Sequence, residues 1–193
     1  GVVVDPLPHR DDEILFQPMH EPSSVYRVRL SQLQRHRNLK GLGPGREGPL
    51  DRGQFSESAR VANLLEPVAW WLTDGEGDVR AAWTKPTDAS ARLWYRRSVD
   101  APWEEVLSFE PGELPDVIPL GFTEDGRRML AASDRGRDRY GLYEFDPEEA
   151  EIGSRIYEHP TAQVFGVIYD FSGTRPVGAI FHHQGNPGFQ YFE

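Results

Sequence analysis

The chain of 193 residues contains no cysteine. This absence excludes disulfide bonds, thiolate metal sites and a cysteine nucleophile. The sequence also has no run of about 18 apolar residues, which a membrane-spanning helix would require. Its N-terminus lacks the basic segment followed by an apolar segment that marks a secretory signal peptide. We expect a soluble protein, and the compartment stays open between cytoplasm and periplasm.

Positive charge is also in short supply. The chain has 21 Lys and Arg against 31 Asp and Glu, which gives a formal net charge of −10 at pH 7. Nucleic acids and anionic membranes are bound through basic surfaces. We therefore expect neither a nucleic acid nor a membrane as a partner.

Helix signals are scarce, and the segment from Glu57 to Leu65 is one of the few that could form a short helix or remain a loop. Elsewhere, apolar residues alternate with polar ones in short runs that end in turn-forming residues. Glycine (19 residues) and proline (16 residues) are abundant, as in a fold with many turns. The pattern predicts an all-β protein.

A unit of about 45 residues occurs four times, and a period of this length with several short strands per unit is typical of β-propeller blades. Equivalent aromatic-rich strands centre on Tyr26, Trp94, Tyr143 and Gln190. The first interval is longer than the others, which we attribute to an inserted surface loop at 42–60. The expected blades are 2–41, 61–112, 113–160 and an incomplete fourth at 161–193.

Within these units we expect about four four-stranded antiparallel blades, the last incomplete, as a fragment of a larger propeller. The expected strands are 2–4, 13–17, 24–30, 36–40, 68–72, 78–84, 91–97, 103–109, 117–121, 127–133, 140–145, 153–158, 164–169, 175–182 and 188–192. Similar turn residues separate the first two strands of each unit, at 8–12, 74–78, 123–126 and 170–173. Asp and Gly suit such turns because Gly accepts positive φ and Asp bonds its own backbone.

Several motifs are better explained by loops, turns or core packing than by chemistry. Gly43 to Gly48 matches G-x-G-x-x-G, but no amphipathic helix follows to bind a pyrophosphate. The alternating acids Asp74, Glu76 and Asp78 begin like a calcium loop, but the required later Gly and Glu are missing, so a hairpin turn is favoured. The tryptophans at 70, 71, 83, 94 and 103 are expected to form blade core rather than a ligand platform.

Candidate catalytic side chains also lack the context that catalysis needs. His182 and His183 are adjacent on an expected strand and so point to opposite faces, which does not suit one metal ion. His159, before Pro160, is expected in a turn. No serine occurs in G-x-S-x-G. The acid pairs Glu104-Glu105 and Glu148-Glu149 are expected to be solvated. We therefore assign no catalytic, cofactor-binding or metal-binding residue, and expect no cofactor.

Five segments have the pattern of propeller blade starts and junctions, namely 70–82, 121–127, 133–146, 157–160 and 167–170. They resemble blade sequences of the prolyl oligopeptidase family, in its acylaminoacyl-peptidase and dipeptidyl-peptidase-like bacterial branch. In that family a propeller caps a C-terminal α/β-hydrolase domain that supplies Ser, Asp and His. The resemblance implies a non-catalytic propeller portion that gates access to a serine peptidase and helps to select oligopeptides. Its implied partners are the hydrolase domain and the peptide substrate.

Two other functions remain open from the sequence. One is a propeller that binds a protein partner, and the other is a carbohydrate-active propeller enzyme with two converging acids. The incomplete fourth unit would leave the strand Phe189 to Phe192 as an open edge, beside an uncovered apolar blade face. We therefore expect self-association through these open blade edges.

Overall fold

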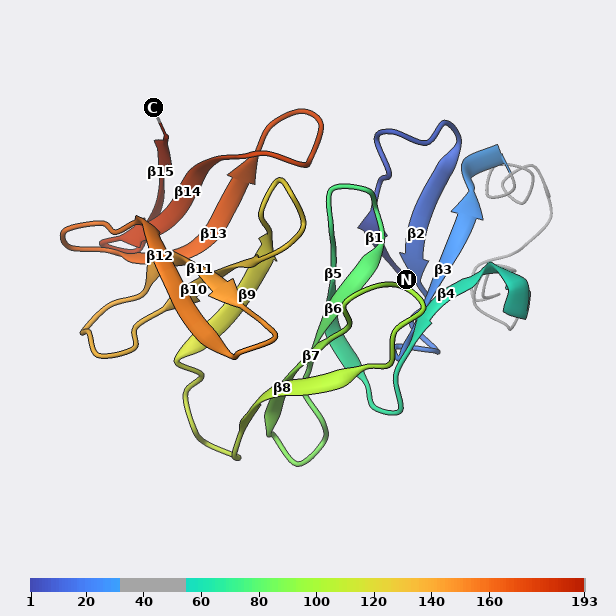
Figure 1. The fold of residues 1–193 in the computed structure, drawn as a ribbon, viewed down its shortest axis with the longest axis horizontal. Helices are drawn as coiled ribbons and strands as arrows, with labels where there is room; N and C mark the ends of the chain where they lie inside the picture. Colours follow the sequence, from blue (N-terminus) through green and yellow to red (C-terminus); the bar gives the residue numbers. More distant parts are fainter. Residues whose placement is uncertain (32–54, 193) are drawn as a thin grey trace, which may run out of the picture.

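The computed structural model describes residues 1–31 and 55–192, and it consists of four small antiparallel sheets arranged as the blades of a β-propeller (Figure 1). Three sheets have four strands and the fourth has three. Among the described residues no helix is long or apolar enough to cross a membrane. The all-β propeller expected from the sequence is confirmed.

Each sheet uses strands that are consecutive in the chain. Sheet 1 contains β1 (Val2–Asp5), β2 (Glu13–Gln17), β3 (Ser24–Arg29) and β4 (Arg60–Asn63). Sheet 2 contains β5 (Val68–Thr73), β6 (Val79–Thr84), β7 (Ala91–Tyr95) and β8 (Glu104–Phe109). Sheet 3 contains β9 (Val117–Phe122), β10 (Met129–Ser133), β11 (Gly141–Asp146) and β12 (Glu151–Tyr157). Sheet 4 contains β13 (Gln163–Tyr169), β14 (Pro176–His183) and β15 (Asn186–Tyr191).

The last strand of sheet 1 differs from the expectation. The chain makes a 3-10 turn, η2 (Glu57–Ala59), and then β4 pairs with β3, with Ala62 opposite Val25. Both of these side chains are buried, so their packing draws 60–63 into sheet 1. Sheet 2 therefore begins at Val68, whereas we expected the second blade from 61. The expected strand 36–40 and most of the loop 42–60 lie outside the described residues.

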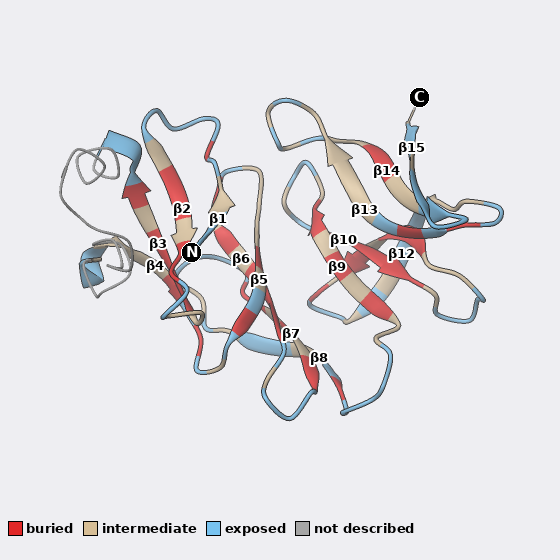
Figure 2. Ribbon diagram, turned by 180° about the vertical axis from the view of Figure 1, so that it is seen from behind, coloured by how far each residue is buried: buried red, intermediate tan, exposed pale blue. Residues whose placement is uncertain are grey.

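The core consists of apolar layers between successive sheets (Figure 2). Sheets 1 and 2 meet through side chains such as Leu15 and Trp71, and sheets 2 and 3 meet through Trp83 and Phe145. The five tryptophans all lie in or beside sheet 2, where Trp83 is buried and stacks on Trp70 at 5.6 Å between ring centroids. Trp71 is also buried, and Trp94 and Trp103 are partly buried against the same layer, so the expected core role is confirmed.

The strand β10, one of the two inner strands of sheet 3, is apolar in its first four residues, Met129 to Ala132. Every residue of β10, Met129 to Ser133, is buried, because the strand has neighbours on both edges and sheets on both faces. Strands covered on both faces lose the polar–apolar alternation of half-exposed strands. The first strands of successive sheets, β1, β5, β9 and β13, lie next to one another near the axis. The turns that follow these strands therefore come together at one end of the molecule.

Candidate functional site

The candidate site is the group of four turns that join the first and second strands of the sheets, which we call the inner turns. They comprise residues 6–12, 74–78, 123–128 and 170–175. The first strands of successive sheets contact each other, β1 with β5, β5 with β9, and β9 with β13. All four inner turns consequently lie at the same end of the propeller axis (Figure 1).

The second, third and fourth inner turns share one backbone design. In each, a glycine N–H donates to the carbonyl oxygen three residues earlier, at 2.9–3.0 Å: Gly77 to Asp74, Gly126 to Thr123 and Gly173 to Asp170. All three glycines have positive φ, between 65° and 78°. Only glycine adopts this conformation without steric cost, which explains its recurrence in the sequence.

Asp74 organises the second inner turn. Its Oδ1 accepts the backbone N–H of Glu76 at 3.1 Å and that of Asp78 at 3.0 Å. Its Oδ2 accepts a hydrogen bond from Arg80 Nη1 at 3.1 Å, and Arg80 Nη2 donates to the hydroxyl of Tyr95 at 2.9 Å. Because both carboxylate oxygens are already bonded, Asp74 is a structural residue here and not a free base.

One acid of the third turn and one of the fourth are also held by their own turns. The hydroxyl of Thr123 and the N–H of Arg127 donate to Asp125 and hold the pKa of its carboxyl below the usual range. In the fourth turn the hydroxyl of Ser172 lowers the pKa of Asp170 in the same way. Hydrogen bonds to the charged form favour ionisation. Both carboxyls therefore stay negative well below neutral pH.

The inner turns pack directly on one another. A Cβ on Gly75 would lie 3.1 Å from Thr174 of the fourth turn and 3.7 Å from the carbonyl oxygen of Glu124 in the third. A Cβ on Gly77 would lie only 2.3 Å from Leu7 of the first turn. The second turn thus contacts the other three and fixes their relative positions.

A tyrosine lies beside the axis, beneath the turns, and joins sheets 3 and 4. Tyr169 reaches from β13 to β9, where its hydroxyl donates to the carbonyl oxygen of Phe122 at 3.0 Å. A Cβ on Gly121 would lie 2.0 Å from that hydroxyl oxygen, so the glycine makes room for the ring. Burial raises the pKa of Tyr169 to about 12. The remaining cavity between the four first strands is about 200 Å³.

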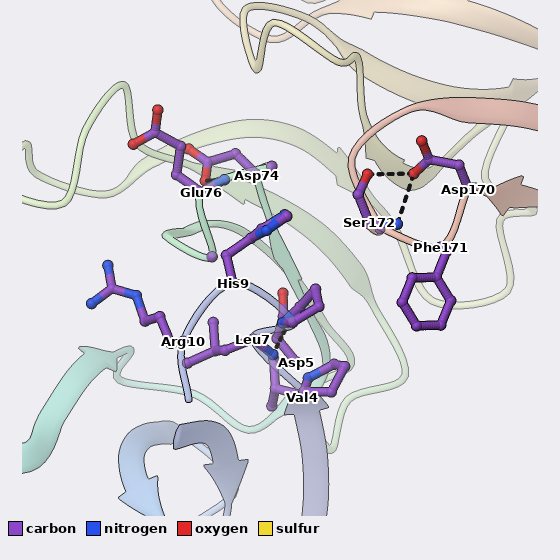
Figure 3. A pocket seen from close by; sticks show the side chains of 15 residues that line it. Val4, Asp5, Leu7, His9, Arg10, Asp74, Glu76, Asp170, Phe171 and Ser172 are labelled. Carbon is purple, nitrogen blue, oxygen red and sulfur yellow. Dashed lines mark hydrogen bonds between the residues drawn. The ribbon is translucent and has the colours of Figure 1, made fainter. Parts of the chain in front are cut away.

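A second cavity, of about 240 Å³, lies between the first, second and fourth inner turns (Figure 3). His9 and Arg10 of the first turn line it together with Glu76 of the second and Phe171 of the fourth. The lining mixes both charges with apolar surface. It does not present a set of converging acid and base groups.

An acidic hollow lies between the second and third inner turns, and we call it the acidic groove. It is about 630 Å³, and its carboxylates are those of Asp74, Glu76, Asp78, Glu124 and Asp125. Glu76, Glu124 and Asp125 are exposed. The basic side chain in the lining is Arg80, which is engaged by Asp74 at 3.1 Å. The groove is therefore suited to a cationic group.

The residues weighed in the sequence fall mostly where expected. The motif 43–48 lies outside the described residues. Asp74, Glu76 and Asp78 form the β5–β6 hairpin turn. Among the described residues no three His, Asp or Glu side chains are placed so that they could hold one metal ion. His182 packs on Phe165 with 3.9 Å between the ring centroids, whereas His183 Nδ1 lies 3.3 Å from the hydroxyl of Thr161. These partners fit the opposite faces expected for the two histidines.

The remaining candidates have ordinary partners. His159 packs on Phe181 with 4.2 Å between ring centroids. Glu148, in the β11–β12 turn, pairs with Arg97 at 2.6 Å, and Glu104 is exposed on β8. Sequence reasoning missed the acidic groove and the role of Tyr169. The repeated position of the turn residues within each unit was the signal for the groove, because equivalent turns of a propeller lie at one end.

A scan of the sequence against protein-family models and a comparison with curated proteins both find no match.

Proposed function

We propose that this chain is the non-catalytic propeller portion of a serine oligopeptidase, which controls access to a separate α/β-hydrolase domain and helps to select its peptides. The observation that carries the proposal is the acidic groove at one end of the propeller axis. The sequence resemblance to propellers of the prolyl oligopeptidase family supplies the identity of the catalytic partner.

The groove has the chemistry to hold the α-ammonium group of a peptide. Exposed carboxylates of Glu76, Glu124 and Asp125 approach it from two turns. The net charge of −10 adds a long-range field that attracts cations. Each exposed carboxylate contributes only about 0.2–1 kcal/mol to such a contact. Selection would therefore come from several weak contacts with a rigid frame and would depend on salt.

The position of Tyr169 beside the axis bears on how access to the hydrolase site would be controlled. Tyr169 spans the first strands of sheets 3 and 4, and the hollow of about 200 Å³ that it lines is smaller than the acidic groove of about 630 Å³. Access control would then come from the propeller covering the hydrolase site and presenting the groove beside it. Peptides would bind at the end of the axis and would not pass along it.

The first prediction concerns peptide binding to the groove. A labelled oligopeptide with a free amino terminus should bind at low salt, and its N-acetylated form should bind several-fold more weakly. Fluorescence anisotropy measures the affinity of each peptide. Replacing Glu76 and Glu124 together by Gln should remove this difference, because the groove then loses two of its exposed carboxylates. Glu104→Gln, an exposed acid on β8, is the matched control and should change nothing.

Equal binding of free and acetylated peptides to the unaltered chain would contradict peptide selection at the groove.

A separate experiment addresses catalysis: the chain should not react with a fluorophosphonate probe, because the serine nucleophile belongs to the proposed hydrolase domain. Stoichiometric labelling of a serine would contradict the division of labour while leaving the groove result intact.

A second candidate function is a propeller that binds a protein partner. One observation favours it, namely the exposed aromatic side chains of sheet 4, among which Phe189 is 60% and Tyr191 is 63% exposed. Large apolar surfaces of this kind mark protein contacts. Capture of one defined protein that is lost on changing Phe189, with no preference for free peptide termini, would favour this function.

A further inference from the structure

Sheet 4 is unusual in carrying no full charge. None of the residues of β13, β14 and β15 is Asp, Glu, Lys or Arg, although such residues make up 27% of the chain. Each of the other three sheets has charged residues in its strands, as at Arg27 in sheet 1, Arg80 in sheet 2 and Glu144 in sheet 3. Charges on outer strands normally prevent sheets from associating. Sheet 4 lacks that protection.

One face of sheet 4 is buried and the other is open. Val164 and Ala179 pack against sheet 3 and are almost fully buried. On the opposite face, which we call the outer face, Phe189 lies beside Ile180, and Tyr191 lies beside Gly178. Phe165 also lies there, stacked on His182, and is 41% exposed. Figure 2 shows β15 largely as exposed strand.

The outer face corresponds to the side that each preceding sheet buries against its successor. In sheet 2 that side presents Trp83 and Leu93 to sheet 3, and in sheet 3 it presents Leu130 and Leu142 to sheet 4. These four side chains are at most 1% exposed. The outer face is the next surface in this series of sheet-to-sheet interfaces. It is therefore suited to pack against another apolar sheet face.

We propose that the outer face of sheet 4 docks against the same face of a second copy of this chain, around a two-fold axis. A face that meets itself must be self-complementary, and an uncharged apolar face meets that condition. It is also where two chains of net charge −10 approach with the least repulsion, because its strands carry no carboxylate.

Two alternative arrangements of the copies fit the structure less well. In the first alternative, sheet 1 of the second copy would cover the outer face. The side of sheet 1 that would do so is already covered, because Phe55 stacks on Tyr26 of β3 with 4.8 Å between the ring centroids. Pairing of β15 edges is hindered by Pro187, which has no N–H to donate. Face-to-face packing of the two copies of sheet 4 leaves the Phe55–Tyr26 stack in place and requires no hydrogen bond from Pro187.

The test measures the oligomeric state of the 193-residue chain by sedimentation velocity from micromolar to millimolar concentration. We expect a reversible monomer–dimer equilibrium. Phe189→Glu should weaken dimerisation by about tenfold or more, because it places two carboxylates in the apolar contact. Phe171→Glu is the matched control: Phe171 is fully exposed in the same blade but lies in the β13–β14 turn, and its change should leave the equilibrium unaltered.

Introduced cysteines identify the surfaces in contact, since the chain has none of its own. Phe189→Cys should give a covalent dimer with a short bismaleimide, whereas Phe171→Cys should not. A chain that is monomeric throughout the concentration range would overturn the proposal. So would a dimer that persists in Phe189→Glu, or one that Phe189→Cys fails to link. Circular dichroism of each variant verifies that the sheets are intact.

Discussion

Arg96 shows how a single residue can hold two blades together. It is 6% exposed, and its guanidinium donates to the carbonyl oxygens of Val79 at 2.8 Å, Val99 at 2.9 Å and Val61 at 3.1 Å. Val61 belongs to sheet 1 and Val79 to sheet 2. The planar guanidinium also lies over the ring of Trp103 at 4.6 Å. Only arginine offers this many donors in one plane.

We predict that Arg96→Met lowers the free energy of unfolding by about 2–3 kcal/mol, because it leaves buried carbonyl oxygens without donors. Urea denaturation measures the change. The control is Arg97→Met, whose side chain is 74% exposed and pairs with Glu148. That pair should contribute less than about 1 kcal/mol. Equal destabilisation by the two changes would contradict the conclusion that Arg96 holds sheets 1 and 2 together.

At the scale of the element, the inner turns combine a backbone requirement with a packing requirement. Gly77 and Gly136 both have positive φ, 78° and 69°. A Cβ on Gly77 would meet Leu7 at 2.3 Å, whereas one on Gly136 would meet nothing within 4 Å. The two positions therefore separate the conformational cost of a side chain from the cost of displacing a neighbouring turn.

We predict that Gly136→Ala costs about 1 kcal/mol from backbone strain alone. Gly77→Ala should cost a further 1–3 kcal/mol, roughly, because Leu7 must move. Thermal unfolding of both variants tests this difference. The larger cost should be accompanied by chemical-shift changes in the first turn. If the two variants were equally stable, contact between the first and second turns would not contribute to folding.

At the scale of the whole molecule, the partly buried Tyr169 between sheets 3 and 4 predicts how stability depends on alkaline pH. Burial raises the pKa of Tyr169 to about 12, above its value of about 10 in the unfolded chain. The protonated hydroxyl is favoured by folding, so its stabilising contribution is complete below about pH 10 and is lost as pH rises through about 12. Stability should fall in that window.

The matched variant is Tyr169→Phe, which removes the titrating hydroxyl together with its hydrogen bond to Phe122. It should be less stable at neutral pH by about 1 kcal/mol and should show a shallower decline between pH 10 and 12. Burial also raises the pKa of Tyr157, so Tyr157→Phe is the comparison for a site away from the axis. An unchanged slope in Tyr169→Phe would show that this group does not control the alkaline transition.

The sequence by itself determined the all-β class, the four repeated units and the turn chemistry between their first and second strands. Those properties are local: glycine is required where φ is positive, and apolar residues recur along strands, so each can be recognised from neighbouring residues. The core role of the tryptophans also followed, because aromatic clusters within strands normally face a neighbouring sheet.

Only the tertiary structure decided which strand closes sheet 1, and which turns form the acidic groove. The segment 60–63 pairs with β3 across an intervening stretch of chain, and such pairing depends on packing between Val25 and Ala62 that no local pattern reveals. The groove joins turns about 50 residues apart, as the blade period dictates. The contact that Tyr169 makes with the neighbouring blade needs Gly121 of that blade, so it appears only when the sheets meet.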